Sequence, residues 1–478
     1  MRNLKRTLSL VMAMALIVGM MVVSASAVSS DFNDSAEITN TEAVDVMTAI
    51  GVFEGTDKGA FNPTGILTRE QAAKIVAVML LGEEDANKLS TNSTTFKDVA
   101  ANRWSAGYIG YCVQQGILAG TGNGNFDPEG ELTGLAFAKM MLVALGYDAK
   151  VANYVGNDWA INVAADAVNA GIAPKGIVLA DAMTREQAAQ MAFQTLTADM
   201  VYYTNKGTTV NTPDGTQVVV GASAPVKVAN SKTDDYRTVS ADRDEVQQFC
   251  EKYFSDLTLN SNNHDDFGRP STQWKMKTDE IGNYADKADA SYTKEVKLGD
   301  IYADLGLSTR TVPTVFEDGK DLKNTNAEVL YKGNSTKIGA NGVLTEAYVD
   351  DDDNVTIVRI NTYVGQVNRS VAATSSKDAY IVINTMSQKP VTGGTVNYET
   401  NESFDDDAYV LYTYANNEVQ SVAVAESVSG EVTTYTTGKN ITVGGTKYDY
   451  SKNIAGETAP ATKNDYVVYL DAYGYAIY

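Results

Sequence analysis

Histidine and cysteine are almost missing from this chain of 478 residues, and their scarcity excludes several kinds of chemistry. His264 is the single histidine, which excludes histidine-based catalytic triads and metal sites built from several histidines. Cys112 and Cys250 are too few for a disulfide framework in an exported chain of this length, so we interpret both as small apolar residues of the core. Hydrolysis by paired carboxylates stays open, because acidic residues are abundant.

The sequence contains only one long apolar run, which lies near its start. Leu8 to Val23 carries no charge, three basic residues precede it, and Ala25-Ser26-Ala27 supplies small residues for a signal-peptidase site. This order is typical of a secretory signal peptide over residues 1–27, with a retained signal anchor as the alternative. No later stretch is apolar over the roughly 20 residues that a membrane helix needs, so we expect an exported chain without a membrane span.

Basic residues are outnumbered, because 38 Lys and Arg stand against 60 Asp and Glu and give a net charge of −22. Loss of the signal peptide with its three basic residues would take this charge to −25. Such a surface repels nucleic acid and anionic lipid, so neither is an expected partner. It can attract divalent cations where copies of the chain crowd together, so a weak interfacial Ca²⁺ site stays open, and no other cofactor is expected.

The sequence contains internal repeats. The sequence ILTREQAA at 66–73 returns as AMTREQAA at 182–189 and, more weakly, as ELTGLAFA at 131–138, with the threonines 65 and 51 residues apart. A glycine-rich loop and Phe-x-Pro precede the first and middle copies, at 61–63 and 126–128, whereas the third copy has a shorter loop. This spacing indicates that each unit is one supersecondary block.

Each block is expected to be a helix, a glycine-rich loop and a second helix. Thr68 and Thr184 are suitable N-caps, and Gln71 and Gln187 at the third helical position complete capping boxes. Apolar residues then recur at helical spacing and form one stripe. One block cannot bury both of its stripes, so the three are expected to pack around a shared core.

The order Gly-Ile-x-x-Gly, Phe-x-Pro and Thr-Arg-Glu resembles the S-layer homology (SLH) family over about residues 31–200. The resemblance implies three SLH repeats, at 28–90, 91–150 and 151–204, folded as an all-α three-fold prism. It also implies that the prism binds secondary cell-wall polymers, often ones that end in pyruvylated sugars. The protein would then be secreted and held in the cell wall or S-layer.

The rest of the chain is rich in Thr, Val, Tyr, Asn and Asp, with the alternation typical of strands. We expect a mixed, mainly β region over 205–325 with one helix at 242–254, and tandem β-hairpins over 326–478. The predicted hairpins turn at 350–354, 416–417 and 471–474. The third stops in mid-strand at Tyr478, so we expect the gene product to continue. The fold class is therefore multidomain, with the all-α prism followed by mainly-β tandem domains.

Arg69 and Arg185 are unusual, because each is expected in the first turn of a helix, where the helix dipole disfavours a cation by roughly 0.3–1 kcal/mol. One interpretation is a compact anion site, in which the guanidinium and free helix N–H groups bind the carboxylate of a wall sugar. The SLH resemblance supports this and extends it to Glu70 and Glu186, since the family's Thr-Arg-Ala-Glu motif is implicated in polymer recognition. The alternative is an ion pair between repeats, with Asp or Glu.

Trp104 and Trp159 stand at matching places in the second and third repeats. Each is either a surface for stacking a sugar ring or a core residue at the start of a helix. The repeats also differ, because Gly134-Leu135 replaces the Arg-Glu pair in the second, and Ile38 lies near the tryptophan position of the first. At most two arginine-bearing sites are therefore expected to bind.

The acidic turn at 350–354 has the composition of a calcium loop but not its pattern. Val355 stands where an EF-hand needs glycine, and Asn361 where it needs the closing glutamate. A solvated hairpin turn is the better interpretation, and the same holds for the acidic run at 405–407. No metal site within one chain is predicted.

We predict a structural, non-enzymatic component of the surface layer that associates with its own copies. Segments 265–270 and 355–367 also resemble surface-layer proteins of clostridia and their relatives, although this implies no chemistry. One alternative is an SLH-anchored adhesin or ligand-binding protein. Another is a wall-anchored glycan hydrolase, which is disfavoured because the acids are spread through turns without a recurring cluster of carboxylates and aromatics.

Overall fold

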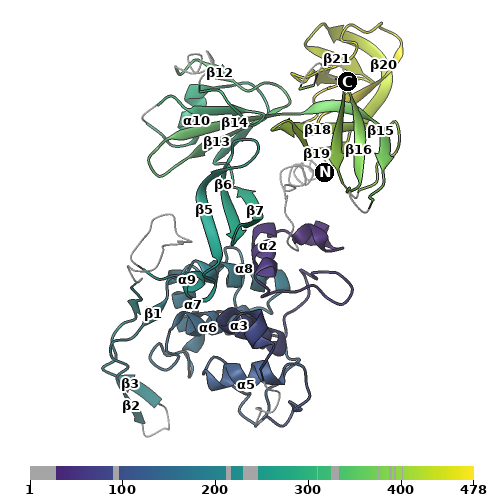
Figure 1. Cartoon of the computed structure of the whole chain (residues 1–478). Coiled ribbons are helices and arrows are strands. Elements are labelled where there is room, and N and C mark those ends of the chain that lie inside the picture. Colours follow the sequence, from purple (N-terminus) through teal and green to yellow (C-terminus); the bar gives the residue numbers. More distant parts are fainter. Residues whose placement is uncertain are drawn as a thin grey trace. The chain divides into compact units, whose positions relative to one another are not determined.

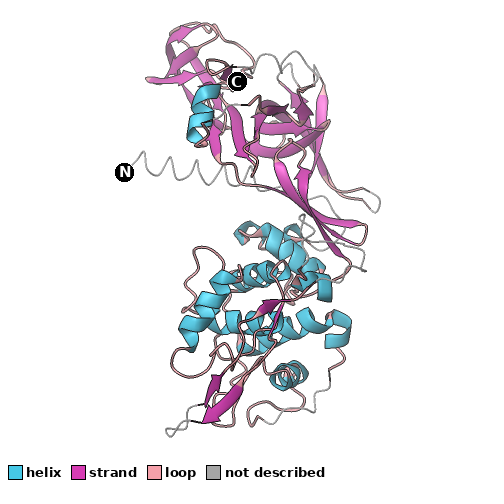
Figure 2. Ribbon diagram, turned by 90° about the vertical axis from the view of Figure 1, so that its left-hand side faces the viewer, coloured by secondary structure: helices cyan, strands magenta, loops and turns pink. Residues whose placement is uncertain are grey.

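The computed structural model describes residues 28–89, 96–211, 217–229, 246–308, 311–323, 333–374, 377–386, 390–391, 394–400 and 402–478. These residues divide into two compact units (Figures 1 and 2). The helical unit comprises the described residues of Val22–Ser261 and Gln273–Asn283, and the β unit those of Asn262–Thr272 and Tyr284–Tyr478. The predicted signal peptide lies outside the described residues. No helix in the described ranges has both the length and the apolar character needed to cross a bilayer.

Each repeat of the helical unit contributes two helices joined by a loop. The pairs are α2 (Thr41–Ala49) with α3 (Arg69–Leu81), α5 (Ala106–Gln114) with α6 (Gly134–Leu145), and α7 (Trp159–Asn169) with α8 (Arg185–Leu196). Short helices lie beside them: η1 (Ser29–Asp31), η2 (Ser35–Glu37) and α4 (Glu83–Ala86). The hydroxyls of Thr68, Thr133 and Thr184 each accept a hydrogen bond from the N–H three residues later. The repeated motif therefore fixes where each second helix begins.

The helices of neighbouring repeats pack in a regular pattern. The second helix of each repeat contacts the first helix of the next, which gives α3 on α5, α6 on α7, and α8 back on α2. Phe61 and Phe126, from the two Phe-x-Pro loops, are fully buried. Because α8 contacts α2, the helix contacts return from the third repeat to the first.

A closed cycle of backbone hydrogen bonds joins Leu67, Leu132 and Met183, which directly precede the three capping threonines. The N–H of Leu67 donates to the carbonyl of Met183 at 2.8 Å, that of Met183 to Leu132 at 2.8 Å, and that of Leu132 to Leu67 at 3.0 Å. All three side chains are buried. Because each repeat supplies one donor and one acceptor, the cycle is complete only with all three repeats.

The chain that follows α8 differs from the predicted long helix. Helix α9 spans only Phe249–Tyr253, with Gln248 as its N-cap, and Val246 forms a β-bridge with Ala229. The prediction of one helix over 242–254 is therefore wrong for the described residues 246–248, and 242–245 lie outside the described residues. The extended bridge competes with helical backbone at Val246.

Both cysteines are buried and free, Cys112 in α5 and Cys250 in α9. Burial raises the pKa of the Cys112 thiol to about 12 and that of Cys250 further, so both stay protonated at neutral pH. Their environment is that of small apolar core residues.

A three-stranded sheet follows, with β5 (Leu257–His264), β6 (Pro270–Met276) and β7 (Asp279–Ala285) in that order. Trp274 of β6 is buried in the helical unit. Its indole N–H donates to Oε1 of Glu42 in α2 at 2.8 Å, and its ring meets that of Phe193 in α8 edge-on at 5.4 Å. This strand therefore packs on the helices of the first and third repeats.

Three consecutive segments of the β unit, which we call β repeats, share one strand order. A leading strand pairs with the first strand of a hairpin, and the hairpin's second strand follows. The strands are β8 (Ala290–Tyr292), β13 (Val343–Val349) and β14 (Val355–Asn361); β15 (Tyr363–Val371), β18 (Tyr409–Ala415) and β19 (Glu418–Val424); and β20 (Glu426–Thr436) and β23 (Asp465–Leu470). In the third β repeat, the second hairpin strand is represented by the bridge between Leu470 and Ala476.

Further elements lie between each leading strand and its hairpin. These are β9 (Val296–Lys297), α10 (Leu298–Asp304), β10 (Thr314–Glu317), β11 (Lys320–Asp321) and β12 (Lys337–Ile338) in the first; β16 (Tyr380–Thr385) and β17 (Thr395–Glu399) in the second; and β21 (Asn440–Val443) and β22 (Thr446–Asp449) in the third. Each β repeat has its own apolar core, represented by Ile357, Ile383 and Val432.

The acidic turn at 350–354 joins β13 to β14 and is exposed. Asp350 builds this turn, because its Oδ1 accepts the N–H groups of Asp352 at 3.0 Å and Asn354 at 2.8 Å. Asp471 repeats the geometry, accepting the N–H groups of Tyr473 and Tyr475, both at 2.9 Å. Within the described ranges, no cluster of three His, Cys, Asp or Glu residues could hold a metal ion. The residues of the acidic turn are exposed and form the turn of the β13–β14 hairpin.

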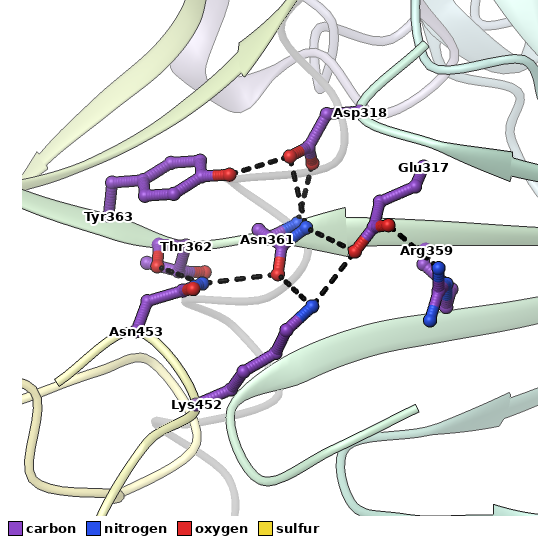
Figure 3. A network of polar contacts seen from close by, with 8 residues as sticks. All are labelled: Glu317, Asp318, Arg359, Asn361, Thr362, Tyr363, Lys452 and Asn453. Carbon is purple, nitrogen blue, oxygen red and sulfur yellow. Dashed lines mark hydrogen bonds and ion pairs between the residues drawn. The ribbon is translucent and has the colours of Figure 1, made fainter. Parts of the chain in front are cut away.

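The three β repeats meet at a network of polar side chains (Figure 3). Glu317 of β10 accepts from Arg359 of β14 at 2.7 Å and from Lys452, which follows β22, at 2.8 Å. Asp318 accepts from the N–H of Asn361 at 2.9 Å and from the hydroxyl of Tyr363 at 2.7 Å. Charged side chains therefore tie the turn after β10, the link between β14 and β15, and the third β repeat together.

Candidate functional site

The predicted binding residues lie where one repeat meets the next. We name these places junction 1–2 (α3 with α5), junction 2–3 (α6 with α7) and junction 3–1 (α8 with α2). At junction 1–2, Arg69 Nε donates to the carbonyl of Phe126 and Nη2 to that of Ala119, both at 2.9 Å. The guanidinium carbon lies 4.6 Å from the centroid of the Phe126 ring. Arg69 of the first repeat thus holds the loop of the second.

Arg185 makes the same contacts at junction 3–1. Its Nε donates to the carbonyl of Phe61 and its Nη2 to that of Glu54, both at 2.9 Å, and the guanidinium carbon lies 5.2 Å from the Phe61 ring centroid. The hydrogen bonds of both arginines, as far as the structure describes them, go to carbonyl oxygens and not to carboxylates. Among the described residues, neither arginine forms the ion pair between repeats that was the predicted alternative.

The prediction that backbone N–H groups at the starts of these helices are free to bind a ligand is wrong at their first two positions. The N–H of Arg69 donates to the carbonyl of Gly130 and that of Glu70 to Pro128, both at 3.0 Å. In α8, the N–H groups of residues 185 and 186 donate to carbonyls of the first repeat at 2.8 and 3.1 Å. The loop of the adjacent repeat supplies an acceptor for each donor, so no backbone donor of these first two positions is left for a ligand.

The two glutamates bind the adjacent repeat. Glu70 is buried and accepts from Arg103 Nε at 2.7 Å, Arg103 Nη2 at 2.8 Å and Ser105 Oγ at 2.6 Å. Burial alone would raise the pKa of Glu70, but the hydrogen bonds from Arg103 and Ser105 outweigh it and hold the pKa below its ordinary value. Glu186 accepts from the backbone N–H of Thr39 and Asn40, directly before α2. Both carboxylates therefore bind the segment that enters the next first helix.

The capping residues follow the predicted geometry. Thr68 Oγ1 accepts the N–H of Gln71 at 3.4 Å, and the Gln71 side chain accepts the N–H of Thr68 at 3.1 Å. Thr184 and Gln187 make the same reciprocal pair at 3.3 and 3.0 Å. These four side chains fix the N-terminal starts of α3 and α8, and therefore the positions of Arg69 and Arg185 in the first helical turn.

Junction 2–3 has no arginine but has Lys139 of α6, which the motif search did not single out. Lys139 Nζ donates to the carbonyl of Tyr154 at 2.8 Å and lies 5.8 Å from the ring centroid of Trp159, the first residue of α7. No ion pair of Lys139 is found among the described residues. Lys74, at the same distance from its capping threonine, pairs instead with Glu54 at 2.9 Å. Lys139 and Trp159 are both half-buried.

Trp104 lies at junction 1–2 and is 51% exposed, so it is not a core residue. Its ring centroid is 6.3 Å from that of Tyr108 in α5, and it directly follows Arg103, which pairs with Glu70. An exposed indole beside a second aromatic ring offers an apolar face to solvent.

Each junction therefore carries one half-buried cation, Arg69, Lys139 or Arg185, whose hydrogen bonds go to carbonyl oxygens. Burial lowers the pKa of all three; the charges of Asp127 and Asp98 oppose this at Arg69, and those of Asp34 and Glu54 at Arg185. The free energy of desolvating these cations is only partly offset within the protein. An anionic group at the junction would offset more of it.

Comparison with known proteins identifies the domain type of the first two repeats. The S-layer homology domain model matches residues 31–73 and 95–138, which lie in the first two repeats. The chain is 28% identical over 236 residues to a cell surface protein of Thermoanaerobacter kivui, which is 48% of this chain and 30% of that protein. It is 27% identical over 147 residues to the S-layer protein sap of Bacillus anthracis, 31% of this chain and 17% of that protein. It is 35% identical over 86 residues to the cellulosome-anchoring protein of Acetivibrio thermocellus, 18% of this chain and 19% of that protein.

This chain is therefore an SLH-domain surface protein. It is secreted and belongs to the cell wall or S-layer, as its relatives do. It spans less than a third of the length of each relative described above. The names of these relatives describe surface proteins and not enzymes. Their alignments cover between 18% and 48% of this chain.

Proposed function

We propose that the helical unit is a three-fold SLH prism that binds an acidic secondary cell-wall polysaccharide non-covalently. The observation that carries this proposal is the set of three junction cations, Arg69, Lys139 and Arg185, each half-buried with hydrogen bonds to carbonyl oxygens. In a chain of net charge −22, these are local positive sites for the carboxylate of a sugar such as a pyruvate ketal.

Tryptophan rings lie at two of these junctions and support a sugar ligand. Trp104 is exposed at junction 1–2, and Trp159 lies below the ammonium group of Lys139 at junction 2–3. A sugar ring can stack on an indole face while its carboxylate meets the neighbouring cation. In this proposal Glu70 and Glu186 act by positioning, because they fix the segments that enter α5 and α2.

We further propose that the β unit is a structural part of the surface layer, with no catalytic step. Repeated β segments, each with an apolar core, suit a spacer or a lattice element. The wall polymer and other copies of the chain are the expected partners.

The test is sedimentation of the purified full chain with cell-wall sacculi, before and after removal of the secondary polymer. The proposal predicts that the protein sediments with intact sacculi and stays in solution with stripped ones. High salt should weaken the binding, because the junction cations are partly exposed. Sedimentation that is equal with both kinds of sacculi, or absent with intact ones, would contradict the proposal.

A further inference from the structure

A two-stranded ribbon in the helical unit has no role in the arrangement described so far. It consists of β2 (Thr208–Asn211) and β3 (Gln217–Val220), which pair antiparallel with each other and with no other strand of the described residues. Both views of the molecule show the ribbon projecting from the helices of its unit (Figures 1 and 2). An isolated two-stranded ribbon is only marginally stable in water.

The base of the ribbon is nevertheless fixed. Asn205 accepts the N–H of Gly207 at 2.9 Å and donates to the carbonyl of Gly221 at 3.0 Å, and the N–H of Ser223 donates to the carbonyl of Asn205 at 2.8 Å. Lys206 forms an ion pair of 3.0 Å with Asp148, next to α6. The ribbon therefore leaves the helical unit at a defined place.

One face of the ribbon carries two exposed valines. Thr208 pairs with Val220, and residues two apart share a face of a strand, so Val210 and Val220 lie on the same side. Their side chains are 46% and 54% exposed. Exposed apolar ribbon faces with open edges are sites of pairing with another chain.

The ribbon also lacks the charges that several other edge strands of the described residues carry. Neither β2 nor β3 contains a charged residue, and Asp214 is the single one over 207–224. The edge strands β11, β17 and β22 each carry Lys, Asp or Glu. In a chain of net charge −22, two copies repel each other least where such a neutral surface meets its own copy.

We propose that the β2–β3 ribbon is a contact between two copies of this chain, in which the faces bearing Val210 and Val220 pack together. The contact is isologous, because the same surface serves both copies. This inference deepens the proposed lattice role, since it names the partner as a second copy and the surface that the two copies share. It does not depend on wall binding.

The test uses the purified full chain in analytical ultracentrifugation over a range of concentrations. The double variant Val210→Asp with Val220→Asp should lose self-association by tenfold or more. The matched control, Val424→Asp with Val467→Asp, adds the same charge at valines that are 62% and 53% exposed in the β unit, and it should associate like the unchanged protein. Equal loss in both double variants would overturn the proposal, as would an unchanged protein that stays monomeric at every concentration.

A charge exchange then tests whether ribbon meets ribbon. Copies with Asp at 210 and 220 should associate with copies that carry Val210→Lys and Val220→Lys, although neither variant associates with itself. A mixture that associates no better than its components would overturn the proposal. Sedimentation of each variant with intact sacculi is measured separately, so a failure of the ribbon contact is distinguished from a failure of wall anchoring.

Discussion

The helical unit and the β unit each contain three repeats, and they join them with different chemistry. The helical unit closes its repeats into a cycle through backbone hydrogen bonds of Leu67, Leu132 and Met183. The β unit joins its β repeats through side chains: charged groups around Glu317 and Asp318, and apolar clusters that span two β repeats. Backbone bonds do not depend on which side chain is present, so the repeats of the helical unit can diverge, as Gly134-Leu135 does, without losing the cycle.

This comparison teaches where each unit is vulnerable. A closed cycle couples all three repeats, so damage to one is expected to reach the others. Each β repeat also has a core of its own, so damage inside that core is expected to act mainly on that β repeat, while the joint between β repeats depends on particular side chains. The following predictions are arranged from the largest expected effect to the smallest.

The largest effect is expected for Leu132→Ala, in the middle repeat of the helical unit. Leu132 is buried, so the loss of its side chain should destabilise the unit by about 2–5 kcal/mol. Hydrogen exchange should rise in α3 and α8 as well as in α6, because the cycle is shared. The matched change Val468→Ala should raise exchange mainly in the third β repeat. Exchange confined to α6 would contradict the coupling of the repeats.

The next effect concerns the joint of the β unit. Asp318→Ala leaves the N–H of Asn361 and the hydroxyl of Tyr363 without their acceptor, which should cost about 1–3 kcal/mol in urea unfolding. Asp351→Ala, in the exposed turn after β13, is the control and should stay within about 0.5 kcal/mol of the unchanged protein. Equal stability of the two variants would show that the network does not hold the β repeats together.

The two units should also respond to pH with opposite signs. Burial raises the pKa of Asp471 in the β unit to about 6. The folded β unit therefore binds this proton more tightly than the unfolded chain, and its stability should fall as pH rises from about 4 to 6. Glu70 in the helical unit has a lowered pKa, so its contribution is present at neutral pH and is lost as pH falls through that pKa.

Hydrogen exchange of each unit between pH 4 and 7 checks this prediction, after correction for the intrinsic exchange rate. Asp471→Asn should flatten the response of the β unit in that range and leave the helical unit unchanged. A β unit that becomes more stable from pH 4 to 6 would contradict the assignment to Asp471.

The smallest loss of stability is expected when the N-cap threonine of a helix is replaced, and its size should differ between two kinds of cap. Thr184→Ala removes a reciprocal capping box and should cost about 1 kcal/mol in thermal or urea unfolding. Thr133→Ala removes a cap without the return bond, because Ala136 has no side chain to supply it, and should cost less. If Thr133→Ala cost more than Thr184→Ala, the capping box would not explain the difference between these helices.

The sequence predicted much of the local structure, because its signals are local. The capping motif at Thr68 and Thr184 marked the helix starts, and the turns at 350–354 and 416–417 marked two hairpins that the structure contains. The helix at 242–254 failed because the partner of Val246 in the β-bridge, Ala229, is a tertiary feature.

The candidate site could be predicted only in part, because its contacts join residues far apart in the chain. The sequence pointed to Arg69 and Arg185 but could not show that the loop carbonyls of the adjacent repeat occupy their donors. A signal for Lys139 was present: Lys74 and Lys139 both follow their capping threonine by six residues, and Ala119 stands in the second repeat where Glu54 stands in the first.

That pair of lysines gives the most direct test of the central claim that the junction cations bind an acidic wall polymer. Lys139→Gln and Lys74→Gln remove the same charge from the same helical position, but only Lys74 has a carboxylate partner among the described residues. The measurement is the affinity of each variant for purified secondary polymer by calorimetry. We predict that Lys139→Gln weakens binding about tenfold or more, since a hydrogen bond to a charged group contributes about 1.5–3 kcal/mol, and that Lys74→Gln binds like the unchanged protein. Equal affinity of the two variants would contradict the claim.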